Sequence, residues 1–284
     1  MKIGVIREAF AGEKRVASTP EVVAKLVKKG FEVVVEKGAG ESSHFHDPQY
    51  VEAGARLVER AEALSADMVF SVRKPTHEIV TGLNEKAILI SHLEDCEDDG
   101  TINKLLEKHI VTIGMERIPR ISRAQSMDAL SSQSNIAGYR AVIEAAVHYG
   151  RFLPLMMTSA GSAKPARLVV LGAGVAGLQA IATARRLGAD VHAYDIRPET
   201  REQIESLGAK YIDIDVGESG TGEGGYAREL SDEAKKRQQE LLSDELAKAH
   251  VIVTTALIPC RPAPVLIPAD VVERMREILS KPAP

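Results

Sequence analysis

The sequence predicts an α/β protein built from two parallel-sheet domains with a cleft between them. Short apolar runs alternate with helical patterns over residues 2–114. A glycine-rich turn then joins an apolar run to an alanine-rich segment at residues 166–182, and a second alternation follows it. Alternating strands and helices are typical of parallel sheets covered by helices, so both domains are expected to be Rossmann-like.

The first domain is predicted over residues 1–127. Its first helix should begin at Ser18, Thr19 and Pro20, because a threonine followed by proline is a common helix start. Apolar runs rich in β-branched residues indicate the strands. The predicted elements are strands at 2–6, 31–36, 68–72, 87–91 and 110–114, and helices at 20–29 and 101–108.

The second domain is predicted over residues 128–284. A long helix from about residue 127 to residue 148 leads into it from the first domain. The further predicted elements are strands from 168, at 190–195, 210–214 and 250–255, a helix in the alanine-rich segment after the glycine turn, and helices at 199–207 and 227–248.

The turn at Gly172, Gly174 and Gly177 has the spacing Gly-x-Gly-x-x-Gly between a strand and a helix. The first glycine permits a tight turn, the second lets a pyrophosphate approach the backbone, and the third lets helix and strand pack closely. The positive end of the helix then faces the phosphate charge. An ordinary glycine-rich loop is the alternative, but the pattern favours a dinucleotide site.

A carboxylate stands at the distance expected of a ribose-binding acid. Asp195 ends the next apolar strand, roughly twenty residues after the turn. It can accept both ribose hydroxyls of NAD, and it would repel the 2′-phosphate of NADP. Arg197 favours NADP instead, because a guanidinium can accommodate a 2′-phosphate. We weigh the carboxylate more heavily and predict NAD.

Residues 215–226 hold five glycines and almost no apolar side chain. A loop of this composition cannot pack a core and is expected to be mobile. It is either a solvated linker or a lid in which Tyr226 caps the nucleotide.

Composition excludes several classes of function. The net charge of -4 and the 4% aromatic content give no reason to expect nucleic-acid binding. Residues 168–184 carry no charge, but the glycine turn interrupts them, so no membrane span is expected. His44, His46 and Asp47 lie in one short segment without a further ligand, so we expect a surface turn and no metal site.

A polar segment at residues 116–135 joins the two predicted domains, where a cleft would open. It carries three arginines, a glutamine and an aspartate, and Pro119 argues against a regular helix. A helix entry capped by Ser126, with solvated charges, is the alternative.

These motifs together closely resemble the proton-translocating NAD(P) transhydrogenase family, in its NAD(H)-binding domain I or alpha subunit, within the alanine dehydrogenase/transhydrogenase superfamily. The resemblance covers residues 1 to about 275. It is carried by residues 15–20, 120–128, 131–135, the Gly172 turn, 224–227 and 254–259.

The resemblance implies a Re/Si-specific transhydrogenase that is active only with its partner subunits. This chain would hold NADH, a partner domain would hold NADP, and a membrane domain would couple the step to proton translocation. Hydride would pass directly between the two nicotinamides. Such a transfer needs no protein nucleophile and no metal, so catalysis would consist of positioning and exclusion of water.

The resemblance also assigns roles to residues. A loop would orient the NADH nicotinamide and its ribose through Arg120, Gln125, Asp128 and Ser131. The nucleotide would be held by Gly172, Gly174, Val175, Ala176, Gly177, Asp195, Ile196 and Arg197. Closure over the nucleotide would involve Gly225, Tyr226, Gln238 and Leu257.

The family implies a homodimer at the cytoplasmic face of a bacterial inner membrane, or at the matrix face in a mitochondrion. Family members continue beyond the segment near Met275 with further strands and a return into the first domain, whereas this chain ends at Pro284. We therefore expect a C-terminally truncated form with an open sheet edge and an incomplete first domain.

Two alternatives stay open. An alanine dehydrogenase is similar in fold, in Arg15 and in His92, but its Val-Lys-Glu-Pro motif is replaced here by residues 72–75, which read Val-Arg-Lys-Pro. A lone histidine at a strand end is commonly structural. The other alternative is a non-catalytic NAD-binding module, which would bind NADH without transferring hydride to a partner.

Overall fold

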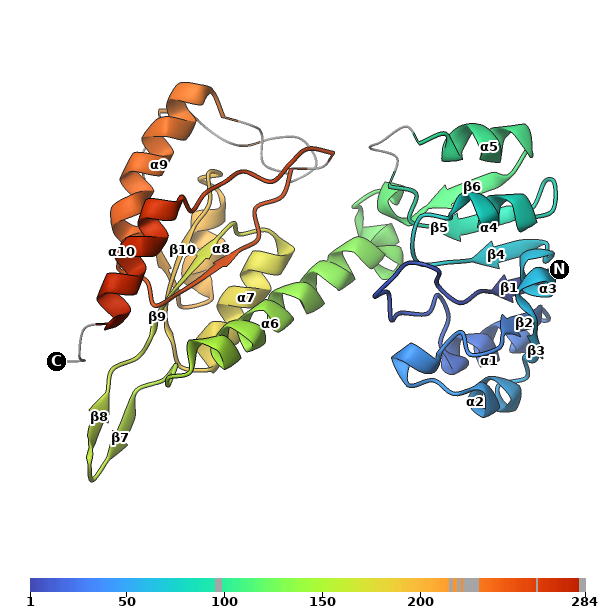
Figure 1. Cartoon of the computed structure of the whole chain (residues 1–284), viewed down its shortest axis with the longest axis horizontal. Coiled ribbons are helices and arrows are strands. Elements are labelled where there is room, and N and C mark those ends of the chain that lie inside the picture. The colour runs from blue at the N-terminus through green and yellow to red at the C-terminus, as the bar shows by residue number, and fades with distance from the viewer. Residues whose placement is uncertain (95–98, 215–216, 219–220, 222–229, 259, 281–284) are drawn as a thin grey trace. The chain divides into compact units, whose positions relative to one another are not determined.

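The computed structural model describes residues 1–284 except 95–98, 215–216, 219–220, 222–229, 259 and 281–284 (Figure 1). The chain divides into two compact units, Met1–Ala129 and Leu130–Pro284. Among the described residues, none of the helices combines the length and apolar character that crossing a bilayer requires.

The first unit contains a parallel sheet of order β3-β2-β1-β4-β5-β6. Its strands are β1 (Lys2–Val5), β2 (Glu32–Glu36), β3 (Arg56–Val58), β4 (Met68–Phe70), β5 (Ile88–Ser91) and β6 (Val111–Gly114). Its helices are α1 (Pro20–Lys28), α2 (Asp47–Glu52), α3 (Arg60–Leu64), α4 (His77–Gly82) and α5 (Thr101–Glu107), with 3-10 turns η1 (Glu41–Ser43), η2 (Met115–Arg117) and η3 (Ser122–Met127).

The run of apolar residues in β2 shows why this sheet is covered on both faces. Val34 packs into one hydrophobic cluster, while Val33 and Val35 pack into another. Successive side chains of a strand point to opposite faces, so a strand buried on both faces reads as a continuous apolar run. Helix α1 begins as predicted, because the Oγ1 atom of Thr19 accepts the Val22 N–H at 3.4 Å.

The second unit contains a parallel sheet of order β11-β10-β9-β12. Its strands are β9 (Arg167–Leu171), β10 (Asp190–Tyr194), β11 (Lys210–Tyr211) and β12 (Val251–Thr254), and an antiparallel hairpin pairs β7 (Met156–Thr158) with β8 (Gly161–Ala163). Its helices are α6 (Ala129–Tyr149), α7 (Val175–Arg186), α8 (Thr200–Ser206), α9 (Asp232–Ala247) and α10 (Ala269–Ser280).

Helices cover both faces of this second sheet (Figure 1). Leu168 and Val170 of β9 pack in the cluster that includes α6 and α7 residues, whereas Val169 and Leu171 pack against α9 and α10. Helix α6 approaches α7 closely, since a Cβ atom at Gly138 would lie 2.0 Å from the carbonyl oxygen of Ala176. The predicted α/β fold with parallel sheets is confirmed.

Some predicted boundaries were wrong. The strand predicted to residue 214 ends at Tyr211, although Ile212 still donates its N–H to Ala193 O at 2.8 Å. The helix predicted from about residue 227 begins at Asp232, because the Ser231 hydroxyl caps it by accepting the Ala234 N–H. The β7–β8 hairpin was not predicted, since its side chains are mostly exposed and leave no apolar alternation in the sequence.

Candidate functional site

The glycine turn after β9 needs two of its glycines for steric reasons. Gly172 has a left-handed φ of 98°, and its N–H donates to Tyr194 O at 2.8 Å. A Cβ atom at Gly177 would lie 1.8 Å from the carbonyl oxygen of Gly172. A Cβ atom at Gly174 would meet no atom within 4 Å, so the backbone there is open to an incoming group.

Helix α7 begins at this open position. Gly174 is its N-cap residue and makes no side-chain capping bond, and both Gly174 and Val175 are exposed. The first N–H groups of a helix lack partners within the helix and carry a partial positive charge. The N-terminus of α7 therefore has the chemistry of an anion site and fits the pyrophosphate of a dinucleotide. Ala176 lies in the same first turn, half-buried beneath α6.

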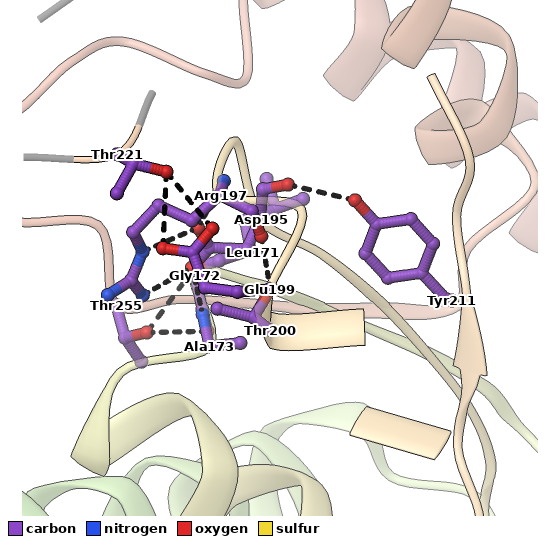
Figure 2. A network of polar contacts seen from close by, with 10 residues as sticks. All are labelled: Leu171, Gly172, Ala173, Asp195, Arg197, Glu199, Thr200, Tyr211, Thr221 and Thr255. Atoms are coloured by element: carbon purple, nitrogen blue, oxygen red, sulfur yellow. Dashed lines mark hydrogen bonds and ion pairs between the residues drawn. The ribbon is translucent and has the colours of Figure 1, made fainter. Parts of the chain in front are cut away.

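Asp195 follows β10 directly and lies beside the turn (Figure 2). Its Oδ2 atom accepts the Ala173 N–H at 2.6 Å and an Nη2–H of Arg197 at 2.8 Å. Its Oδ1 atom accepts the N–H and the Nε–H of Arg197, both at 2.9 Å. The carboxylate is 5% exposed, so it is a buried acceptor that joins the end of β10 to the turn after β9.

Arg197 is held by both its side chain and its backbone. The hydrogen bond to Asp195 raises the pKa of its guanidinium, and its carbonyl oxygen accepts the Thr200 Oγ1–H at 2.8 Å and the Thr200 N–H at 3.1 Å. Glu199 lies nearby, and its carboxylate accepts the hydroxyl of Thr221 at 3.0 and 3.1 Å (Figure 2). Charge of both signs therefore surrounds the end of β10.

Thr255 lies directly after β12, which pairs with β9 on the side opposite β10, and it contacts the same turn. Its N–H donates to Leu171 O at 2.8 Å, and its Oγ1–H donates to Gly172 O at 3.0 Å. The strand order reverses between β9 and β12, which is where open α/β sheets bind dinucleotides. Neither Thr255 nor Ala173 is among the site residues predicted from the sequence. A hydroxyl residue directly after a buried strand was the available signal for Thr255.

The other predicted nucleotide residues have different surroundings. Ile196 packs against Leu230 and Ala234, and Leu257 is 63% exposed in the segment after β12. Gln238 is buried on α9, where its Nε2–H donates to the Tyr194 hydroxyl at 3.1 Å. Burial raises the pKa of that hydroxyl to about 12. Gly225 and Tyr226, and with them the predicted lid, lie outside the described residues.

The predicted nicotinamide loop is divided between the two units. Gln125 lies in η3, and the Asp128 N–H donates to its carbonyl oxygen at 3.3 Å. Arg120, Gln125 and Asp128 belong to the first unit, whereas Ser131 lies in the first turn of α6 in the second. Their joint action on a nicotinamide stays a prediction.

The basic side chains named for the alanine dehydrogenase alternative lie beside acidic side chains in the first unit. The Arg15 guanidinium donates to Glu13 at 2.7 and 2.8 Å, which lowers the pKa of that carboxyl to about 2. Arg73, at the place of the motif's lysine, pairs with Glu94 at 3.1 Å, and the Nδ1 atom of His92 lies 3.5 Å from a carboxylate oxygen of Glu116. Within the described stretches of the chain, no three His, Cys, Asp or Glu side chains are grouped as a metal ion would require.

Comparison with known proteins gives two family matches and several close relatives. Residues 4–137 match the alanine dehydrogenase/PNT N-terminal domain, and residues 141–278 match the corresponding C-terminal domain. The chain is 50% identical to an NAD(P) transhydrogenase alpha-subunit protein of Rhodospirillum rubrum, over 97% of this chain and 74% of that protein. It is 30% identical to the alanine dehydrogenase of Staphylococcus saprophyticus, over 98% of this chain and 70% of that protein.

A solved structure agrees with these sequence matches. The transhydrogenase of Sinorhizobium meliloti superposes with a TM-score of 0.85 and 43% identity, over 97% of this chain and 75% of that one. The two-domain architecture is therefore shared with a protein of known structure.

Proposed function

This chain belongs to the alanine dehydrogenase/PNT family, and from that premise we propose that it is the NAD(H)-binding component of a proton-translocating NAD(P) transhydrogenase. It holds NADH and passes hydride to NADP held on a partner domain. The higher identity to a transhydrogenase subunit, 50% against 30% for the alanine dehydrogenase, supports this choice within the family.

The observation that carries the proposal is the cluster at the carboxyl edge of the second sheet. The open backbone at Gly174 and the N-terminus of α7 fit a pyrophosphate, and the Asp195 carboxylate lies one hydrogen bond away from the same turn. A buried carboxylate at the end of the second strand favours NAD, because the extra phosphate of NADP would be repelled.

The chain's own residues would orient the nucleotide and exclude water. NADH, when bound, supplies the hydride of the reaction. Arg120, Gln125, Asp128 and Ser131 would fix the nicotinamide and its ribose, since direct hydride transfer requires position rather than a protein nucleophile. Gly225, Tyr226, Gln238 and Leu257 would close over the nucleotide, Gln238 through its support of Tyr194.

The partners of the proposed function are a second copy of this chain, an NADP-binding domain and a membrane domain. Exposed apolar side chains at the β7–β8 hairpin support the proposal of a second copy. Met157 is 77% exposed, and Phe152 and Leu155 beside the hairpin are 57% and 55% exposed. A two-stranded hairpin is marginally stable alone in water, so a covering subunit would stabilise it. The dimer would lie at the cytoplasmic face of a bacterial inner membrane, or at the matrix face in a mitochondrion.

An alanine dehydrogenase is the less favoured alternative. The Val-Lys-Glu-Pro motif of that enzyme is not retained, because Arg73 stands at the place of its lysine and pairs with Glu94. NADH oxidation that depends on pyruvate and ammonia would identify that activity.

A fluorescence titration with NADH and, in parallel, NADPH tests the proposed cofactor. We expect saturable NADH binding with a clear preference over NADPH, and no NADH oxidation on addition of pyruvate and ammonia. Equal affinity for both nucleotides would contradict the assignment of this chain to the NAD side of a transhydrogenase.

A further inference from the structure

The guanidinium of Arg197 occupies the acceptor positions that a ribose would use on Asp195. A carboxylate has about four acceptor positions on its two oxygens. Two are filled by the backbone N–H groups of Ala173 and Arg197, and two by the Nε–H and Nη2–H of Arg197, at 2.6 to 2.9 Å. The guanidinium fork spans both oxygens, as the two hydroxyls of a ribose would.

We propose that Arg197 could bind a nucleotide 2′-phosphate but is held away from this role by its ion pair with Asp195. The two residues together then set the preference for NAD(H) over NADP(H). This inference rests on the proposed function, because it takes the adenosine ribose to approach Asp195. Binding of NAD(H) is then an exchange in which the ribose hydroxyls replace the guanidinium on the carboxylate.

The backbone of Arg197 stays in place during this exchange. Its N–H donates to Asp195 and its carbonyl oxygen accepts two hydrogen bonds from Thr200. Only side-chain torsions are therefore available. Because Arg197 lies directly beside Asp195 (Figure 2), the released guanidinium would remain next to the bound ribose. Arginine binds phosphate through paired N–H donors, so a guanidinium freed from Asp195 is suited to a 2′-phosphate there.

Glu199 provides a matched control for charge. After the hydrogen bond to Asp195, the negative charge of Glu199 also raises the pKa of Arg197, and its carboxylate accepts the Thr221 hydroxyl. Neutralising Glu199 changes the net charge by the same amount as neutralising Asp195, but leaves the two side-chain hydrogen bonds between Asp195 and Arg197 intact. A general charge effect and the release of Arg197 can thus be separated.

The test is a fluorescence titration of the full chain and its variants with NADH and NADPH. We expect Asp195→Asn to weaken NADH binding and to strengthen NADPH binding by at least about tenfold. A tenfold change in affinity corresponds to the free energy of one hydrogen bond to a charged group. The double variant Asp195→Asn/Arg197→Gln should lose the gain in NADPH affinity. Glu199→Gln should keep the preference for NADH.

The proposal is overturned if Asp195→Asn gains no NADPH affinity, if the double variant keeps the gain, or if Glu199→Gln gains as much. An asparagine retains an amide oxygen for the Ala173 N–H, and circular dichroism checks the fold. Asp195→Ser replaces it if the asparagine variant is unfolded. A wild-type chain that binds neither nucleotide overturns the proposed function and this proposal together, whereas a wild-type preference for NADH without the switch overturns this proposal alone.

Discussion

The Oδ2 atom of Asp195 accepts the backbone N–H of Ala173 at 2.6 Å, so the end of β10 is bonded to the turn after β9. Replacing Asp195 by alanine leaves that N–H without its acceptor and leaves the guanidinium of Arg197, which is 12% exposed, without its carboxylate. We expect a loss of about 3 kcal/mol in the free energy of unfolding, measured by urea denaturation. Asp195→Asn, the control, should lose less, and equal losses would show that the amide oxygen does not replace the carboxylate.

Substitutions at two glycines of the turn should have different effects, one on stability and the other on NADH binding. Gly177→Ala forces a Cβ atom to within 1.8 Å of the Gly172 carbonyl oxygen, so we expect it to cost about 1–3 kcal/mol of stability. Gly174→Ala has open space and should change stability by less than about 0.5 kcal/mol while weakening NADH binding. Thermal unfolding and NADH titration measure the two effects. A destabilised Gly174→Ala variant with unchanged NADH affinity would contradict this division.

The hydroxyl of Thr255 should matter for the geometry of the turn. Thr255→Val removes the hydrogen bond to the Gly172 carbonyl oxygen and keeps the side-chain shape, so we expect about 1 kcal/mol of lost stability and weaker NADH binding. Thr255→Ser keeps the hydroxyl and should retain most of the stability and most of the NADH affinity. If the serine and valine variants behave alike in urea denaturation and in titration, the hydroxyl is not the responsible group.

Gln238 should act on the site through Tyr194. Gln238→Leu removes the side-chain donor to the buried Tyr194 hydroxyl, and we expect a loss of about 1–2 kcal/mol in stability. A double-mutant cycle with Tyr194→Phe measures the coupling, which should approach the loss caused by Gln238→Leu alone. Additive losses in the cycle would mean that the two side chains act independently.

Stability should fall as the pH drops below about 6.5, the ordinary pKa of histidine. Burial lowers the pKa of His192, although the hydrogen bond that His192 donates to Asp190 opposes this shift, and burial also lowers the pKa of His250. A histidine with a lowered folded pKa binds its proton more readily in the unfolded chain, so stability is complete above the unfolded pKa and is lost as the pH falls towards the folded pKa.

Urea denaturation at pH values from 7.5 to about 5 measures this dependence. His192→Gln should make the dependence shallower. His148→Gln serves as the control, because that side chain is 83% exposed on α6. Variants with identical pH dependence would exclude His192 as a source of the effect.

Much of the fold could be predicted from local sequence, since the determining signals are themselves local. The apolar run Val33–Val35 predicts a strand buried on both faces, and Thr19 before Pro20 predicts the start of α1. The boundary at Asp232 was missed although Ser231 is an ordinary N-cap residue, because the polar residues around it carry no hydrophobic periodicity. The β7–β8 hairpin was missed because its mostly exposed side chains give no apolar alternation in the sequence.

The candidate site was predictable in its residue types and less so in its contacts. The glycine spacing and the distance to Asp195 follow from the sequence, because both reflect the length of one strand-helix-strand unit. The engagement of Asp195 by Arg197 and Ala173 could not be predicted, since it depends on rotamers and on the register of β9 against β10. The same limit applies to Gln238, which was expected to close over a nucleotide and whose side chain bonds to Tyr194.

A measurement of hydride transfer between two bound nucleotides tests the proposed transhydrogenase function. The chain loaded with NADH is mixed with an NADP-binding domain of a transhydrogenase that carries an oxidised NADP analogue, and the reduced analogue is followed by its absorbance. We expect transfer that requires both proteins and that is slower with the Gly174→Ala variant. Tight NADH binding without any transfer in the presence of the partner domain would contradict the proposed function and would favour a non-catalytic NAD-binding module.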